Sequence, residues 1–354
     1  MICFSVFLKE TYANTFYRGK WLFMLKRPNI LVVGSLNMDV IASAERLPNA
    51  GETVIGQKFR TAAGGKGLNQ AVQCARLGAN VTMVGKVGRD DFGKKLLCVA
   101  EEAGVDISHI LTAETESTGV AVIMLELKES GTQNRITVCP GSNYTITVDE
   151  LAWLQETIEH YDMLIVQFEL PMPVVEAVAQ WAHDAGVAVM VNPAPAAPIS
   201  DKLLSCATYL SPNEHEAAAL ANHPISVEGG IHYDDVDAVA EAFRSRGVEN
   251  LMITMGSNGA VIIDKEGIHH TECVKMPHAV DPTAAGDSFV ASFCTALTAG
   301  LPKAQALTFA SHAAAITVSR MGAINSLPEL SEVLDLLKER KCKIDTEYLL
   351  KLVQ

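Results

Sequence analysis

Residues 29–36 read Asn-Ile-Leu-Val-Val-Gly-Ser-Leu, an almost unbroken apolar run that ends at glycine and serine. A strand with both faces buried in a parallel sheet has this pattern, whereas a half-exposed strand alternates apolar and polar residues. Parallel sheets of this kind bind their ligands at the carboxyl ends of the strands. The stretch therefore predicts a central strand of a parallel sheet, with candidate site residues directly after it.

Further apolar segments alternate with helical segments along the rest of the chain. This alternation is typical of a doubly wound α/β fold, in which a mostly parallel sheet is flanked by helices. We expect one such domain over residues 29–340. The predicted strands are residues 81–84, 163–167, 187–191, 209–210, 251–255 and 260–263, and the predicted helices are residues 70–77, 91–103, 174–185, 236–246 and 287–299.

Two stretches break this strand–helix rhythm: residues 53–61, and residues 118–127 together with 135–138. They contain β-prone residues and polar turns without an intervening helix. We expect them to form a small antiparallel β lid, drawn from about residues 38–61 and 118–138. A lid of this kind covers a substrate, and its strands can pair with a second subunit, so we also expect a homodimer.

Composition excludes several classes of partner. The 354-residue chain has a formal net charge of −13, and such an acidic chain repels nucleic acids. After the first segment, charged residues interrupt every long apolar stretch, so we expect no membrane span. The eight cysteines stand singly, without a CxxC pair, which is typical of reduced thiols in a cytoplasmic protein. Residues 1–28 are interpreted as an N-terminal extension and residues 341–354 as a C-terminal tail.

The first candidate motif runs Ala-Gly-Gly-Lys-Gly-Leu-Asn-Gln-Ala over residues 63–71 and leads into a predicted helix. Glycine lets backbone amides approach a ligand closely, and a helix start favours electron-rich oxygens. Lys66 and Asn69 add side-chain donors, while Asn37 and Asp39 follow the first strand and face the same sheet edge. Asp39 can accept hydrogen bonds from two sugar hydroxyls at once. The alternative is a tight turn with a solvated Lys66.

The second candidate motif runs Asp-Pro-Thr-Ala-Ala-Gly-Asp over residues 281–287 and precedes another helix. Small residues before a helix form a pocket of N–H groups that can hold phosphate charge during transfer. Asp287 then lies where a hydroxyl nucleophile is deprotonated in phosphoryl transfer. The alternative is that Asp287 only caps its helix, which is a common structural role.

In order and spacing, both motifs resemble the two signatures of the ribokinase family of carbohydrate kinases. The first signature continues to Gly78 and Gly88, and the resemblance covers roughly residues 29–337. It implies a ribokinase-like α/β fold with a β lid, and Asp287 as the catalytic base. It also implies a set of sugar-binding residues: Asn37, Asp39, Gly65, Lys66, Gly67, Asn69, Glu169 and Asp287.

The resemblance also implies the positions of ATP and of two kinds of metal ion. The implied ATP residues are Asn213, Thr254, Met255, Gly256, Ser257, Asn258, Gly259, Gly286, Asp287 and Ser311, and the anion hole would comprise Ala284, Ala285, Gly286 and Asp287. Mg²⁺ is implied near Asn213 and Glu216, through water, because this ion sheds its hydration shell reluctantly. The residues implied for K⁺ are Asp281, Thr283, Thr317, Arg320, Gly322 and Ser326. His312 is interpreted as a packing residue rather than an adenine contact.

The implied reaction transfers the γ-phosphoryl group of ATP to the exocyclic hydroxyl of a pentose, converting D-ribose to D-ribose 5-phosphate. Lys66 is the main indication of this substrate. Deoxyribose, another sugar or a nucleoside remains an alternative within the family. Outside it, a non-catalytic sugar or nucleotide binder and a nicotinamide-dependent enzyme remain, although no GxGxxG motif follows the first strand.

Overall fold

A large, mostly parallel sheet forms the centre of the molecule. The computed structural model describes residues 27–128, 131–227 and 229–353. Within these ranges nine strands pair in the order β13-β12-β11-β10-β9-β8-β1-β4-β5. The strands from β11 to β5 run parallel, and β12 and β13 are antiparallel. The strands are β1 (Asn29–Val33), β4 (Asn80–Gly88), β5 (Asp106–Ala113), β8 (Met163–Gln167), β9 (Ala188–Asn192), β10 (Tyr209–Leu210), β11 (Leu251–Thr254), β12 (Ala260–Asp264) and β13 (Gly267–Thr271).

Strand β1 is buried on both faces, as its sequence predicts. Ile30 and Val32 pack into one hydrophobic layer, whereas Leu31 and Val33 pack into the other. All four side chains are fully buried. Successive side chains of a strand point to opposite faces, so a strand between two helical layers has to be apolar throughout.

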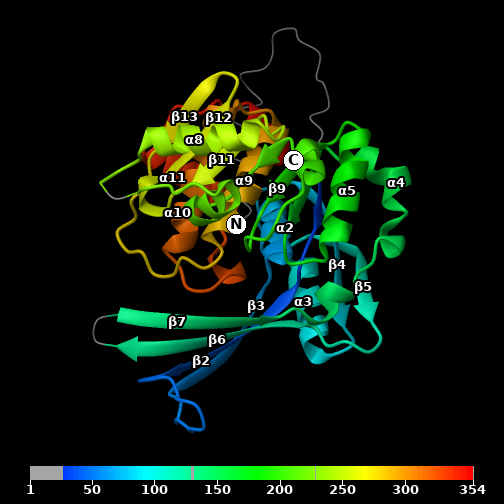
Figure 1. Cartoon of the computed structure of the whole chain (residues 1–354), viewed down its shortest axis with the longest axis vertical. Coiled ribbons are helices and arrows are strands. Elements are labelled where there is room, and N and C mark those ends of the chain that lie inside the picture. The colour runs from blue at the N-terminus through cyan, green and yellow to red at the C-terminus, as the bar shows by residue number, and fades with distance from the viewer. Residues whose placement is uncertain (1–26, 129–130, 228, 354) are drawn as a thin grey trace.

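Helices cover both faces of this sheet (Figure 1). One layer contains α2 (Lys66–Arg76), α3 (Asp91–Glu102), α9 (Ala285–Ala299), α10 (Lys303–Val318) and α11 (Leu330–Glu339). The other contains α4 (Leu154–Thr157), α5 (Met172–Asp184), α6 (Asp201–Cys206), α7 (Glu214–Ala221) and α8 (Tyr233–Arg244). The predicted doubly wound class is confirmed. The first predicted helix starts earlier than expected, at Lys66 rather than Gln70, so the glycine-rich motif itself begins α2.

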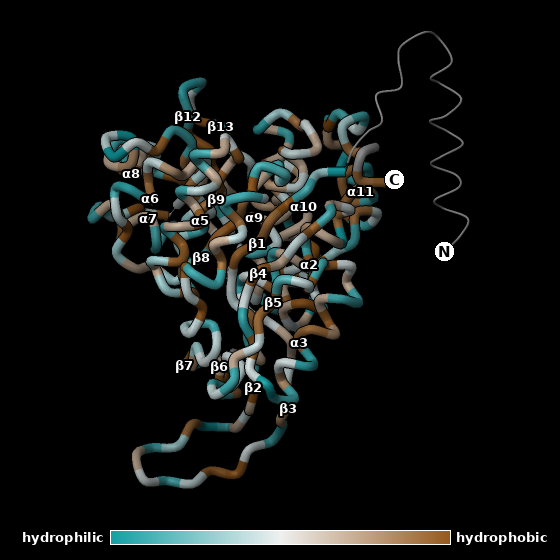
Figure 2. Tube along the Cα trace, turned by 90° about the vertical axis from the view of Figure 1, so that its right-hand side faces the viewer, coloured by the Kyte–Doolittle hydropathy of each residue, from teal (hydrophilic) through white to brown (hydrophobic). Residues whose placement is uncertain are grey.

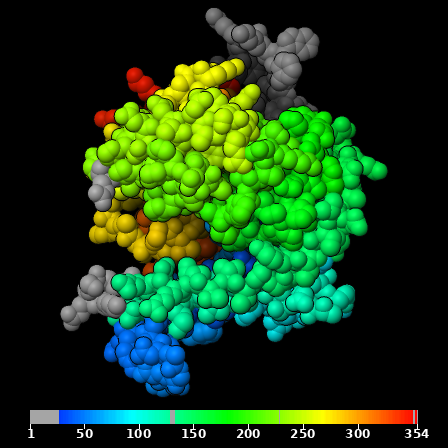
Figure 3. Space-filling view, viewed as in Figure 1, coloured from blue at the N-terminus to red at the C-terminus, as the bar shows by residue number. Residues whose placement is uncertain are grey.

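Four strands form the predicted lid, which lies below the body in Figure 1. They pair in the order β3-β2-β6-β7. The lid strands are β2 (Asn37–Ala44), β3 (Lys58–Gly64), β6 (Gly119–Lys128) and β7 (Gly131–Cys139). The space-filling view shows the lid as a separate ledge, with a hollow between it and the body (Figure 3).

The central pair of the lid differs from the expected antiparallel arrangement. β2 pairs with β6 in parallel, whereas β2–β3 and β6–β7 are antiparallel. The cause lies in the main sheet, where β1 and β5 run in the same direction. β2 follows β1 and β6 follows β5, so both lid strands leave the body with the same sense. Residues 53–57, which were expected to be extended, belong to the long β2–β3 connection seen at the foot of Figure 2.

The two ends of the chain were both expected to lie outside the fold. The predicted N-terminal extension lies outside the described residues up to position 26. The C-terminal segment contacts the body at some of its residues: a short helical turn at Tyr348–Leu352 buries Leu349 and Leu352 in the layer that contains α2 and α9. Among the described residues, no helix is long and apolar enough to cross a membrane.

Candidate active site

The strand order reverses at β1, which creates a crevice. The chain passes from β1 to β4 and β5 on one side and returns to β8 on the other, and ligands bind at such points in α/β sheets. Ser35 follows β1, and its Oγ donates to Glu169 Oε2, after β8, at 2.5 Å. Asn37 Nδ2 donates to the same oxygen at 3.2 Å. Two predicted sugar residues, Asn37 and Glu169, therefore meet here, together with Ser35, which was not predicted.

The glycine-rich turn lies against the end of β1. A Cβ on Gly65 would lie 2.7 Å from Asn37 N, and a Cβ on Gly67 would lie 2.5 Å from the backbone that follows β1. Gly65 also has a φ of 96°, a conformation that disfavours side chains. Lys66 N donates to Glu169 Oε2 at 3.4 Å. Both glycines are therefore required for the backbone to reach the predicted sugar site.

Asp287 lies in the first turn of α9 and is held by α2. Asn69 Nδ2 donates to Asp287 Oδ2 at 2.8 Å, and Gln70 Nε2 donates to Asp287 Oδ1 at 3.0 Å. The N-cap residue of α9 is Ala284, in the left-handed conformation. The alternative that Asp287 only caps its own helix is therefore wrong, because the carboxylate accepts hydrogen bonds from a different helix.

A cavity of about 230 Å³ opens beside Asp287. Its lining combines predicted phosphate-side and metal-side residues with unpredicted ones: Lys66, Asn192, Ala194, Ser211, Asn213, Glu216, Thr254, Pro282, Ala284, Gly286, Asp287 and Val290. Lys66 thus lies on both sides of the site, with its backbone amide near Glu169 and its side chain in this cavity. Burial lowers the pKa of Lys66, but the carboxylates of Asp287, Glu169 and Glu216 outweigh burial and hold the pKa above its usual value.

Asp39 brings a carboxylate from lid strand β2 to the site. Its side chain is buried, and its oxygens pack so closely over Gly64 that a Cβ there would lie 2.9 Å from Oδ2. Burial, and then repulsion from Glu169 and Asp287, raises the pKa of Asp39 to about 6. A carboxylate with this pKa changes its charge within the physiological pH range.

Asn213 and Glu216 form a reciprocal cap at the start of α7. Asn213 Oδ1 accepts from the amides of His215 and Glu216, while Glu216 Oε2 accepts from Asn213 N. The side-chain oxygen of Asn213 is thus engaged in the cap, and the residue also lines the cavity beside Asp287. Burial raises the pKa of Glu216. Thr254 joins this corner through a parallel β-bridge to Asn213.

Asp281 ties the loop before α9 to the turn after α10. Its Oδ1 accepts from Thr283 N and Thr283 Oγ1 at 3.0 and 2.6 Å, and its Oδ2 accepts from Gly322 N at 2.9 Å. These three predicted K⁺ residues are therefore brought together. The hydroxyl of Thr317 instead bonds to Ser288 Oγ and Ala313 O.

Several other predicted residues have partners inside the chain. Arg320 pairs with Glu332, and the Ser326 hydroxyl donates to Ala323 O. Met255 is buried in the core, so its side chain is not available to a nucleotide. The remaining residues of the 254–259 turn are at least partly exposed, while Ser311 is buried on α10.

His312 makes contacts that agree with its interpretation as a packing residue. Its Nδ1 lies 2.8 Å from Thr308 O, and its Nε2 lies 3.3 Å from Cys342 Sγ. Both ring nitrogens are therefore used within the protein.

Sequence reasoning assigned no role to several polar residues of the site: Ser35, Gln70, Gln167, Asn192 and Ser211. Gln167 and Asn192 are the last residues of β8 and β9. A polar side chain that ends an otherwise apolar buried strand was the available signal, because it falls at the ligand-binding edge of a parallel sheet.

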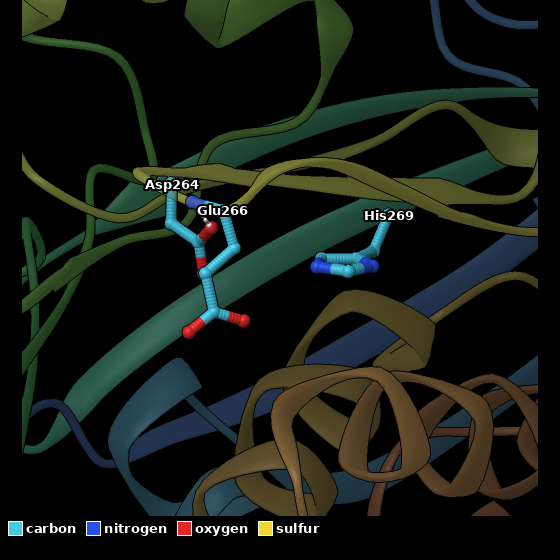
Figure 4. Close-up of side chains that lie close together, drawn as sticks. All are labelled: Asp264, Glu266 and His269. Carbon is cyan, nitrogen blue, oxygen red and sulfur yellow. Dashed lines mark hydrogen bonds between the residues drawn. The ribbon is translucent and has the colours of Figure 1, made fainter.

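A second cluster of potential metal ligands lies in the β12–β13 hairpin (Figure 4). Asp264, Glu266 and His269 approach one another there, but Asp264 Oδ2 lies 2.6 Å from Lys303 Nζ and its Oδ1 accepts from Glu266 N. Asp264 is the buried carboxylate of this cluster, and the ammonium group of Lys303 already neutralises it. We therefore interpret the cluster as an ion pair rather than a metal site.

The comparisons with known proteins agree with this geometry. The family model of the pfkB family carbohydrate kinases matches residues 27–330. Ribokinase of Schizosaccharomyces pombe is 40% identical over 312 residues, which cover 86% of this chain and 96% of the relative. Deoxyribokinase of Salmonella typhi is 28% identical over 305 residues, which cover 86% and 97%. The structure of Arabidopsis thaliana ribokinase complexed with ribose and ATP has a TM-score of 0.80 and 32% identity, covering 88% of this chain and 99% of that one. The chain therefore belongs to the pfkB family of carbohydrate kinases.

Proposed function

We propose that the protein transfers the γ-phosphoryl group of ATP to the exocyclic hydroxyl of D-ribose, giving D-ribose 5-phosphate and ADP. One observation carries this proposal: the Asp287 carboxylate lies between a hydroxyl-binding set of polar groups and a cavity that begins at a helix start. A base in that position contacts the acceptor hydroxyl on one side and the donor phosphate on the other.

The sugar side offers acceptors and donors suited to several hydroxyls. Asn69 is almost fully buried, and its Oδ1 has no hydrogen-bond partner among the described residues. Because this oxygen is shielded from solvent, a sugar hydroxyl would reach it only after a movement of the surrounding groups, and the new hydrogen bond would then remove the cost of a buried, unpaired acceptor. Asp39 and Glu169 add carboxylates, Asn37 adds an amide, and the backbone of Gly65 and Gly67 borders the same space.

The phosphate side offers positive charge and N–H donors. Lys66 carries its charge in the cavity, and the first amides of α9 add the partial positive charge of a helix start. Asn213 Nδ2 is a further donor. Ala284, Ala285, Gly286 and Asp287 then form the anion hole for the charge that develops on the transferring group.

Asp287 is the general base in this reaction. Its carboxylate accepts the proton of the exocyclic hydroxyl as the sugar oxygen bonds to the γ-phosphorus, while the bond from that phosphorus to the bridging oxygen of ADP breaks. The lid closes over the sugar through Asp39 and keeps water from competing as the acceptor.

The residues also fit a magnesium ion bound with ATP. Glu216 lines the cavity, and one of its carboxylate oxygens is used in the helix cap, which leaves the other for the hydration shell of Mg²⁺ near Asn213. When bound, the ion would neutralise charge on the phosphates.

A potassium site beside the anion hole is the more specific proposal. Asp281 holds Thr283 and Gly322 on one carboxylate. In the proposed site, carbonyl oxygens of this loop and of the segment that includes Arg320 and Ser326 would bind the ion. We expect higher kcat in potassium than in sodium at equal ionic strength. Equal rates in both salts would contradict the site.

The lid also presents a surface suited to a second copy of the chain. On the lid face that carries Asp39, Ile136 and Val138 of β7 are 54% and 46% exposed. Apolar side chains on a projecting sheet are typical of subunit interfaces. The proposed homodimer forms through the lids.

Unpaired thiols at the described cysteines support a reducing, cytoplasmic setting.

The substrate assignment is tested with a coupled ADP-release assay on ribose, deoxyribose, fructose and nucleosides. We expect the highest kcat/KM with ribose. Preference for deoxyribose or a nucleoside would move the protein to another specificity within the family.

Asp287→Ala is expected to lose most turnover while its melting temperature stays close to that of the wild type. Near-normal kcat in this variant would refute Asp287 as the base.

A further inference from the structure

Three buried carboxamides connect Asp287 to the ends of two strands. Gln70 Nε2 donates both to Asp287 Oδ1 at 3.0 Å and to Asn192 Oδ1 at 3.1 Å, and Gln167 Nε2 donates to Gln70 Oε1 at 2.6 Å. Gln70 and Gln167 are completely buried, and Asn192 is 7% exposed. Gln70 comes from α2, Gln167 ends β8 and Asn192 ends β9, so the network crosses the floor of the candidate site.

The direction of every hydrogen bond in this network follows from its two fixed ends. Asn192 Nδ2 donates to Ser211 O at 2.8 Å, and a backbone carbonyl can only accept. Asn192 Oδ1 must therefore face Gln70. An ionised carboxylate also only accepts, so Gln70 turns its NH₂ group to both Asn192 and Asp287. Gln70 Oε1 then faces Gln167, which must donate. Only one orientation of the Gln70 amide is therefore compatible with all of its partners.

We propose that Gln70 is a positioning residue that fixes the rotamer of the base Asp287, and that Gln167 and Asn192 hold Gln70 in place. Gln70 and Asn69 each supply one N–H group, one to each carboxylate oxygen, so the plane of the carboxylate is set and each oxygen keeps a lone pair for the acceptor hydroxyl. These donors are neutral amides, which do not compete for the proton that Asp287 receives.

The direction of the hydrogen bonds in the network strengthens the bond from Gln70 to Asp287. Gln167 donates to the oxygen of the same amide whose nitrogen donates to Asp287, and hydrogen bonds arranged head to tail polarise one another. Gln167 also lies two residues before Glu169, which borders the sugar, while Asn192 lines the phosphate-side cavity. The base is thereby positioned relative to both substrates. This inference rests on the proposed role of Asp287.

The test compares Gln70→Met with Gln73→Met. Gln73 is on the same helix and equally buried, but its Nε2 donates to Pro328 O at 3.2 Å and does not reach Asp287. Methionine keeps the length of the side chain and removes the amide. Loss of an interaction that orients a catalytic group lowers kcat with little change in KM, so we expect Gln70→Met to lose about 10- to 100-fold in kcat with both KM values within about twofold. Gln73→Met is expected to keep kcat, whatever its effect on the melting temperature.

A double-variant cycle tests the role of Gln167. If Gln167 acts through Gln70, Gln167→Met lowers kcat about threefold to tenfold in the wild-type background and changes it little in Gln70→Met. Multiplicative losses would show that Gln167 acts independently. Gln70→Glu places an oxygen against Asp287 in a side chain of the same shape, and we expect it to be slower than Gln70→Met.

The inference is overturned if Gln70→Met keeps kcat within about twofold of the wild type while Asp287→Ala is inactive, and that result would leave the proposed function intact. Activity retained by Asp287→Ala would instead remove the base assignment itself. A crystal structure of Gln70→Met gives a second readout that needs no activity. We expect the Asp287 carboxylate to rotate away from its present plane, and an unchanged rotamer would refute the positioning role.

Discussion

If Asp39 binds the sugar as proposed, we expect sugar binding to depend on pH near pH 6. Because the pKa of Asp39 is raised to about 6, its carboxylate is ionised above this pH and protonated below it. The ionised group offers both oxygens as acceptors, whereas protonation turns one of them into a donor. We therefore expect kcat/KM for the sugar to rise through about pH 6 and then level off, as measured from pH 5 to 8. Asp39→Asn should lower kcat/KM and remove this step.

Two charged neighbours of Asp39 provide matched controls, because they shift its pKa in opposite directions. Glu169 raises the pKa of Asp39 by repulsion, and Arg60, on the adjacent lid strand, lowers it by attraction. Glu169→Gln should therefore move the pH midpoint down, and Arg60→Gln should move it up. Shifts in the same direction would mean that a group other than Asp39 is being titrated.

Gly286 and Gly65 are both glycines of the site, but they should respond differently to alanine. Apart from its chain neighbours and its own helix, a Cβ on Gly286 would meet no described atom within 4 Å, whereas a Cβ on Gly65 would lie 2.7 Å from backbone. We expect Gly286→Ala to keep its melting temperature and lose kcat, because the methyl group projects where the phosphate binds. Gly65→Ala should lower the melting temperature. A stable and fully active Gly286→Ala would contradict the anion hole.

At the residue scale, the sequence predicted which residues lie at the site better than it predicted what each residue does there. Asp287 and Asn69 were expected at the site and lie there, because their motifs fix both residue type and local backbone. Glu169 lies there because it follows the buried strand β8. Lys66 was expected to bind the sugar, a role that stays a prediction, and it also lines the phosphate-side cavity. A motif does not specify where a long side chain points, since this depends on surrounding charges that come from distant strands.

The start of α3 fastens the lid to the body. Asp90 caps this helix through Gly93 N at 2.8 Å and also accepts from Thr118 N and Thr118 Oγ1, just before β6. Burial raises the pKa of Asp90, but these donors outweigh burial and lower it below its usual value. The contribution to stability is therefore present above the unfolded pKa and is lost as the pH falls through the folded pKa.

We expect Asp90→Ala to reduce the free energy of unfolding by about 1–2 kcal/mol, since an N-cap and a link to the lid are lost together. Urea denaturation at pH 7 measures this change. Asp91→Ala is the control, because Asp91 is exposed and pairs only with the exposed Lys94 among the described residues. Equal losses in both variants would mean that the cap contributes nothing specific.

The elements that the sequence missed share a physical cause. β5 and β13 are edge strands of mixed polarity, and α10 is apolar on nearly all sides because it packs between α9, α11 and the sheet. Neither pattern has the period that identifies a strand or a surface helix. The parallel β2–β6 pair was likewise beyond prediction, because it depends on where β1 and β5 lie in the main sheet.

The proposed homodimer is tested at the scale of the whole molecule. Ile136→Lys places a charge on the lid face that carries Asp39, whereas Thr137→Lys, at the next residue, places it on the opposite face of β7. We expect light scattering to show a dimer for the wild type and for Thr137→Lys, and a monomer for Ile136→Lys. A monomeric wild type at micromolar concentration would refute the dimer.

The hydrogen bonds to Asp287 span 217 and 218 residues of sequence, which has a consequence for the order in which the molecule forms. During synthesis, β1 to β7 emerge well before α9, so the lid and three of the nine strands of the main sheet can fold before Asp287 has been synthesised. Contacts of such long separation form late, because closing the loop costs entropy before the contact rewards it. The hydrogen bonds that hold Asp287 therefore form late, and a product truncated before residue 287 would keep Asn37, Asp39, Lys66 and Asn69 of the proposed sugar site but lack its proposed base.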